Sequence, residues 1–119
     1  MAGRNYRDLV VWQEGMDLCV EIYRATDRLP ADERYGLRSQ MRSAAVSIPA
    51  NSAAGQGRRS SGDFRLFLSV AHGSTRELET QVLLSGKLGC LDTAVVERLM
   101  SCLSEVGRLT TALSASLKE

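Results

Sequence analysis

DTAVVERLMSCLSEVGRLTTALSASL, at residues 92–117, is the clearest structural signal in the chain. Its apolar residues recur at intervals of three and four, the spacing that places side chains on one face of an α-helix. These residues are Val95, Leu99, Cys102, Val106, Leu109, Leu113 and Leu117. Asp92 stands where its carboxylate can cap the first free N–H groups. The stretch predicts a long amphipathic helix whose apolar face needs other helices to cover it.

Three earlier segments show the same spacing, over about residues 8–27, 31–56 and 61–87. The predicted inward face of the first is Leu9, Trp12, Met16, Cys19, Val20 and Tyr23. In the second it is Leu37, Met41, Ala44, Ala45 and Ile48, and in the third Phe64, Phe67, Leu68, Ala71, Thr75, Leu78 and Val82. Four such segments with short connections predict an all-α, antiparallel up-down-up-down four-helix bundle, a single domain over residues 1–119.

The breaks between these segments fall at residues that interrupt helices. Pro30 ends the first pattern, and Pro49 lies inside the second, so a kink or break is expected near Pro49 because proline removes one N–H donor. Residues 55–62 have the composition of a loop, in which Ser60 or Ser61 can cap the third helix. Gly89 suits the end of that helix.

Length and composition limit the classes of protein to consider. The chain has 119 residues, of which 44% are hydrophobic and 24% charged, close to the averages of globular domains. No apolar run approaches the roughly 20 residues that cross a bilayer, so we expect a cytoplasmic protein without a membrane partner. No arrangement typical of catalysis is evident, which favours a non-enzymatic role.

The cysteines and the histidine do not indicate a metal site. Cys19, Cys90 and Cys102 are an odd number of widely spaced residues in apolar surroundings, as expected of reduced thiols that pack in a bundle. His72 is the sole histidine, and it lacks the glutamate three positions earlier that di-iron bundles use. We therefore expect neither a metal nor another cofactor.

Positive charge is concentrated in the middle of the chain. Residues 34–76 contain seven arginines and one acidic residue, although the whole chain has a net charge of only +1. One interpretation is a surface for RNA or a nucleoprotein partner, formed by Arg34, Arg38, Arg42, Arg58, Arg59 and Arg65. The other is that the stripe Arg34, Arg38 and Arg42 pairs with the acidic stripe Glu14, Asp17 and Glu21, within one bundle or between subunits. The sequence leaves both open.

Residues 43–55 are unusually rich in small side chains. Small residues let helices approach closely, either inside one bundle or between two subunits. Asn51 lies two residues after Pro49, where its amide could satisfy a backbone group that the proline frees.

Several short segments together resemble one protein family. They are Leu9-Val10-Val11-Trp12, Leu29-Pro30, Gln40-Met41-Arg42-Ser43-Ala44, Ser47-Ile48-Pro49-Ala50-Asn51 with Gly55, Phe64, Phe67-Leu68, Ala71, Gly73-Ser74 and Glu77-Leu78-Glu79-Thr80. In this order they resemble the bacterial four-helix bundle proteins named after the 23S rRNA intervening sequence. The resemblance implies a homo-oligomeric ring, commonly a homopentamer. It also implies similarity to the accessory variability determinant of diversity-generating retroelements, which binds nucleic acid and a reverse transcriptase.

The resemblance also implies a shared interface or ligand surface. By analogy it maps onto Gln40, Ser47, Asn51, Gly55 and Glu77, together with two of the arginines, Arg42 and Arg58. The family usually reads Asn-Ile-Ala-Glu-Gly where this chain has Ala54 in place of the glutamate. We expect a non-enzymatic oligomeric module that binds RNA or a nucleoprotein partner; the alternative is a structural or protein-binding homo-oligomer without affinity for nucleic acid.

Overall fold

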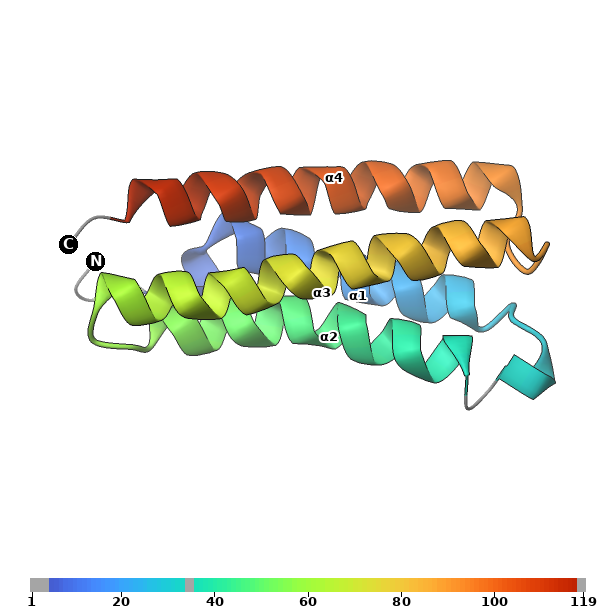
Figure 1. The fold of residues 1–119 in the computed structure, drawn as a ribbon, viewed down its shortest axis with the longest axis horizontal. Helices are drawn as coiled ribbons and strands as arrows, with labels where there is room; N and C mark the ends of the chain where they lie inside the picture. The colour runs from blue at the N-terminus through green and yellow to red at the C-terminus, as the bar shows by residue number, and fades with distance from the viewer. Residues whose placement is uncertain (1–4, 34–35, 118–119) are drawn as a thin grey trace.

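The fold of the computed structural model is a bundle of four antiparallel helices (Figure 1). The structure describes residues 5–33 and 36–117. Its elements are the 3-10 turn η1 (Tyr6–Asp8), α1 (Val10–Thr26), the 3-10 turn η2 (Ala31–Glu33), α2 (Leu37–Gln56), α3 (Ser61–Lys87) and α4 (Thr93–Ser116). No strand occurs in these two ranges. The prediction of an all-α, up-down-up-down bundle is confirmed.

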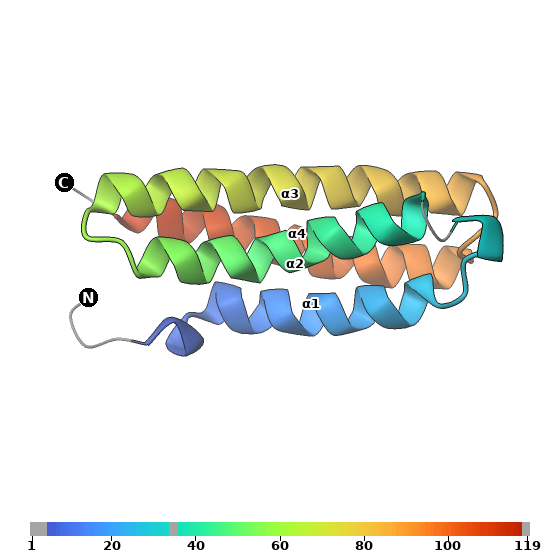
Figure 2. The same ribbon diagram turned by 90° about the horizontal axis from the view of Figure 1, so that it is seen from below.

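The helices occupy the corners of an elongated bundle measuring 46 × 23 × 19 Å. Helix α2 packs against α1 and α3, and α4 packs against the same two helices from the other side. Figure 2 shows α2 lying between α1 and α3 along its length. Helices α1 and α3 are therefore diagonal to one another, and α2 contacts both. No helix of the described chain is both long and apolar enough to cross a membrane.

The core follows the predicted faces of α2 and most of α3 and α4. All five residues predicted to point inward from α2 are buried, and so are Leu68, Leu78 and Val82 of α3. In α4 the buried residues are Val95, Leu99, Leu103, Val106 and Thr110, while Cys102, Leu109 and Leu113, together with Leu117 just after the helix, are only half-buried. Burial of this apolar surface, at about 25 cal/mol per Å², is the main favourable contribution to folding.

The predicted inward face of α1 was wrong in part: Cys19 packs against the core, but three of the predicted residues do not. Met16, Val20 and Tyr23 are 43–47% exposed, whereas Leu18 and Ile22 are fully buried. The reason lies in how closely α1 approaches α2. A Cβ atom at Gly15 would lie 3.4 Å from Pro49, so the glycine side of α1 must face α2. Leu18 and Ile22 share that side, and the alternative apolar stripe is left on the surface.

Helix α2 begins later than predicted. Residues 31–33 form the separate turn η2, and the helix starts at Leu37 rather than near Ala31. The Glu33 carboxylate accepts a hydrogen bond of 3.1 Å from the Leu37 N–H. Glu33 precedes α2 and caps its first turn. Its negative charge also complements the partial positive charge at the N-terminus of the helix.

The helix continues through Pro49 to Gln56 because another side chain satisfies the backbone group that proline leaves free. Pro49 has no N–H to bond the Ala45 carbonyl, and the Cys19 thiol of α1 donates to that oxygen at 3.1 Å. Burial raises the pKa of Cys19 to about 11, so the thiol keeps the proton it donates. The expected helper, Asn51, bonds to Ser47 instead.

The predicted caps are present, whereas the loop predicted over residues 55–62 is shorter than expected. Ser60 Oγ accepts from the Asp63 N–H at 3.1 Å, and Asp92 accepts from the Val95 N–H at 3.0 Å. Gly89 has a φ of 77°, a left-handed conformation that glycine adopts without strain, directly after α3. The α2–α3 connection is short, over residues 57–60.

Candidate nucleic-acid interface

The predicted arginine surface divides into two clusters at opposite ends of α2. Arg38 and Arg42 lie near the start of the helix, beside the end of α1. Arg58, Arg59 and Arg65 lie at its other end, where α2 turns into α3. The remaining predicted residue, Arg34, lies outside the described residues. The five arginines that the structure describes therefore do not form one continuous surface.

Arg38 and Arg42 bind the C-terminal end of α1. Arg38 donates to the carbonyl oxygens of Thr26 and Leu29 at 3.0 and 2.9 Å. Arg42 donates to Thr26 Oγ1, the Tyr23 carbonyl and Asp27 at 2.8–3.1 Å, and its guanidinium carbon lies 4.4 Å from the centre of the Tyr23 ring. The C-terminal end of a helix presents carbonyl oxygens that lack an intrahelical donor, and it carries the partial negative charge of the helix dipole. These two arginines therefore have a structural role, which we call the arginine clamp.

Within one chain, Arg38 and Arg42 do not pair with the acidic stripe of α1, so the expected intramolecular pairing was wrong for these two arginines. Pairing between subunits stays a prediction. Glu21 pairs instead with Arg98 of α4 at 3.3 Å and with Arg24 at 3.7 Å. The acidic stripe faces α4: burial and the negative charge of Glu21, followed by smaller effects of Glu14 and Asp17, raise the pKa of Cys102. Within one bundle, the structural interpretation is right that Arg38 and Arg42 are used in packing and wrong about their partners.

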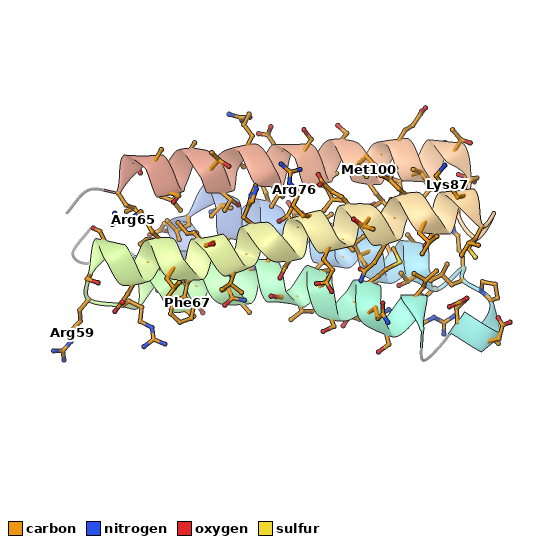
Figure 3. All side chains as sticks on the ribbon, viewed as in Figure 1. Arg59, Arg65, Phe67, Arg76, Lys87 and Met100 are labelled. Atoms are coloured by element: carbon orange, nitrogen blue, oxygen red, sulfur yellow. The ribbon has the colours of Figure 1, made fainter. Side chains whose placement is uncertain are left out.

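The second cluster surrounds a polar hollow of about 290 Å³ at the α2–α3 turn. Its lining consists of Gln56, Arg58, Arg59, Ser60, Ser61, Phe64 and Leu117. We call Arg58–Ser61 the basic turn. Arg58 lies over the Phe67 ring, with its guanidinium carbon 4.6 Å from the ring centre. Arg59 is exposed, forms no ion pair with any described residue, and extends away from the bundle (Figure 3).

The surroundings of the basic turn favour negatively charged ligands. The N-terminus of α3, which begins at Ser61, carries partial positive charge. Arg65 donates to the Leu117 carbonyl at 2.9 Å and so ties the start of α3 to the end of the chain. Asp63 in the first turn of α3 is the one carboxylate between residues 34 and 76. The turn can therefore receive a phosphate through two guanidinium groups and nearby hydroxyls.

Four of the five residues mapped from the family resemblance come together between α2 and α3. Ser47 Oγ lies 2.8 Å from Ser74 Oγ, and Asn51 Nδ2 donates to the Ser47 carbonyl and hydroxyl at 2.8 and 2.9 Å. The adjacent hollow measures about 350 Å³. It is lined by Ser39, Gln40, Ser43, Ala44, Ser47, Ser74 and Glu77. Ser74 was missing from the predicted site, although the Gly73-Ser74 pair had contributed to the resemblance.

Gly55, the fifth mapped residue, has a packing role. A Cβ atom there would lie 2.8 Å from Phe67 Cβ, 2.9 Å from Phe64 Cδ1 and 3.3 Å from the Phe64 carbonyl oxygen. These are closer than ordinary van der Waals contacts, so only glycine fits where α2 and α3 meet. Ala54, which replaces the usual family glutamate, is exposed beside it.

Two adjoining hollows of about 380 and 440 Å³ lie between α3 and α4, and His72 lines both. Its Nδ1 atom is buried without a hydrogen-bond partner. Within residues 5–33 and 36–117, no three or more His, Cys, Asp or Glu side chains are placed to hold a metal ion.

Comparison with known proteins agrees with the fold and with the resemblance. The sequence matches the family model described as the 23S rRNA-intervening sequence protein over residues 7–112. The chain belongs to this family. Among solved structures, it is similar to a protein of unknown function from the S23 ribosomal protein family of Bacteroides thetaiotaomicron VPI-5482, with a TM-score of 0.82 and 20% identity. That match covers 88% of this chain and 98% of the other, and the two share the four-helix fold. No curated protein matches the sequence.

Proposed function

We propose that this member of the 23S rRNA-intervening sequence protein family is a non-enzymatic interaction module that binds RNA through the basic turn. One observation carries the proposal: Arg58 and Arg59 line a polar hollow, and none of its lining residues within the described part of the chain carries a carboxylate. Contacts to phosphate supply most of the affinity of sequence-independent nucleic-acid binding. Arginine suits such contacts because its planar fork of N–H groups can bond two phosphate oxygens together.

The arginine clamp limits where RNA can bind. Arg38 and Arg42 direct their N–H groups at the end of α1, which leaves the opposite end of α2 as the site with available donors. Ser60 Oγ is engaged as the cap of α3, while its hydroxyl hydrogen remains available to a phosphate oxygen. Affinity at this turn rests on charge and should fall steeply with salt.

An electrophoretic shift with single-stranded RNA tests this site. Arg58→Ala with Arg59→Ala is expected to weaken binding roughly tenfold or more at about 50 mM salt, because two phosphate contacts are lost. Arg24→Ala with Arg28→Ala removes the same charge at the other end of the bundle and should leave the shift near that of the wild type. Equal losses in both variants, or a wild type that shifts no RNA at this salt, would overturn the proposal. Circular dichroism confirms that each variant is folded.

A second candidate function is a protein-binding homo-oligomer without affinity for nucleic acid, and the distribution of exposed apolar side chains favours it. Large exposed apolar residues lie on α1, α2 and α3, where they include Met16, Val20, Val46, Leu66 and Val70, whereas none lies on described residues of α4. Helices α1 and α3, which carry most of these residues, pack on either side of α2. Two different apolar faces on one subunit allow head-to-tail contacts that close into a ring.

Absolute molar mass by light scattering tests assembly. A pentameric ring predicts about 65 kDa, five times the 13.0 kDa chain. Met16→Glu with Val20→Glu places charges on the exposed face of α1 and should reduce the mass toward that of one chain. Ser101→Glu, on an exposed position of α4, is the matched control and should leave the mass unchanged. A wild type that elutes at 13 kDa excludes the ring.

A further inference from the structure

The polar hollow between α2 and α3 is separate from the basic turn and is lined mainly by oxygen-bearing side chains. We call it the α2–α3 groove. Serine hydroxyls and the Gln40 amide line it, and among the described residues its single charged lining residue is Glu77. No lysine, arginine or histidine of residues 5–33 and 36–117 contributes to the lining. A hollow of this composition offers hydrogen-bond acceptors and a negative charge to a ligand.

The floor of the groove is already ordered by hydrogen bonds. Ser74 is only 9% exposed, and its hydroxyl pairs with that of Ser47. Asn51 holds Ser47 from the next turn of α2, with bonds to both the carbonyl and the hydroxyl. These residues are therefore fixed by the fold, and a ligand would not have to order them.

Two acceptors on this side of α3 lack a protein partner among the described residues. Glu77 is exposed and forms no ion pair with a described residue. Gln81, one turn further along α3, is only 7% exposed, and its Oε1 atom is buried without a hydrogen-bond partner. Because Gln81 is two turns from Ser74, both lie on the side of α3 that faces α2. Gln81 does not line the groove, so the acceptor within reach of a ligand there is the Glu77 carboxylate.

We propose that the α2–α3 groove binds the guanidinium group of an arginine side chain from a protein partner. The group carries five N–H donors and no acceptor, which complements a lining rich in oxygen atoms. Its positive charge pairs with Glu77, and its weak hydration lowers the cost of entering a hollow of about 350 Å³. This proposal is independent of RNA binding, because the groove shares no lining residue with the hollow of the basic turn.

Titration with N-acetyl-arginine methylamide, followed by amide chemical shifts, tests the groove. Saturable shifts are expected at residues lining the groove, chiefly Ser47, Ser74 and Glu77. The Glu77→Gln variant removes the charge and keeps the shape, and should weaken the apparent affinity roughly fivefold to tenfold. Glu97→Gln, on the exposed face of α4, is the matched control and should bind as the wild type does.

Three outcomes would overturn the proposal. The neutral citrulline derivative could produce the same shifts, the shifts could gather at the acidic stripe of α1, or no saturable shift could occur. The molar mass of the Glu77→Gln protein, measured on a sizing column, shows which protein supplies the arginine. A lower mass than the wild type assigns the side chain to a second copy of this chain, and an unchanged mass assigns it to a different protein.

Discussion

Replacing Arg38 and Arg42 together by alanine should lower the free energy of unfolding by about 2–4 kcal/mol, because charged donors are removed from the end of α1. The Thr26 and Leu29 carbonyls lose the donor that Arg38 supplies, and Thr26 Oγ1 loses that of Arg42. Urea unfolding followed by circular dichroism, at one protein concentration for every variant, measures the change.

The matched control for the arginine clamp is the double variant of Arg24 and Arg28. Both side chains are exposed, and Arg24 forms only a long ion pair of 3.7 Å with Glu21. Their replacement by alanine should change stability by less than about 0.5 kcal/mol. If the two double variants unfold at the same urea concentration, Arg38 and Arg42 are not structural, and a single basic surface along α2 becomes the better account.

Two glycines in helices should respond to alanine in opposite directions. Gly55→Ala introduces a Cβ atom 2.8 Å from Phe67 Cβ and 3.3 Å from a backbone oxygen, so helices α2 and α3 must separate, at a cost of about 1–3 kcal/mol. Gly73→Ala meets no atom within 4 Å and should stabilise α3 by about 0.5–1 kcal/mol through its better helix propensity.

Thermal unfolding of both glycine variants measures the difference. The helix-propensity gain is common to both positions, so the comparison isolates the close approach of α2 and α3. A Gly55→Ala protein that melts at or above the temperature of Gly73→Ala would show that the two helices can separate without cost. Gly55 would then be better explained as part of a ligand-binding surface than by packing.

The four-helix architecture could be predicted because the signal for it is local. Apolar spacing in residues 92–117, the caps at Ser60 and Asp92, and the glycine at position 89 each depend on neighbours in the sequence. The orientation of α1 could not be obtained in this way, since the segment contains two apolar stripes. The choice between them depends on Gly15 meeting Pro49 of another helix.

The roles of the arginines depend on contacts that charge patterns do not reveal. A charge pattern in the sequence matches side chains of opposite sign. Glu14, Asp17 and Glu21 were the expected partners for that reason. Arg38 binds backbone carbonyls, which every residue carries, so no sequence signal marks them. Similarly, Cys19 satisfies the carbonyl that Pro49 leaves free, although 30 residues separate the two in sequence. The mapped residues Ser47, Asn51 and Glu77 could be found by resemblance, but their grouping in one groove required the fold.

The salt dependence of RNA affinity tests the central claim, that the basic turn contacts phosphate, most directly. Each phosphate contact to single-stranded nucleic acid contributes about −0.7 to the slope of log K against log salt. The Arg58→Ala, Arg59→Ala protein should therefore show a slope shallower by about 1.4 than the wild type, while the Arg24→Ala, Arg28→Ala protein keeps the wild-type slope. Identical slopes for all three proteins would contradict the claim.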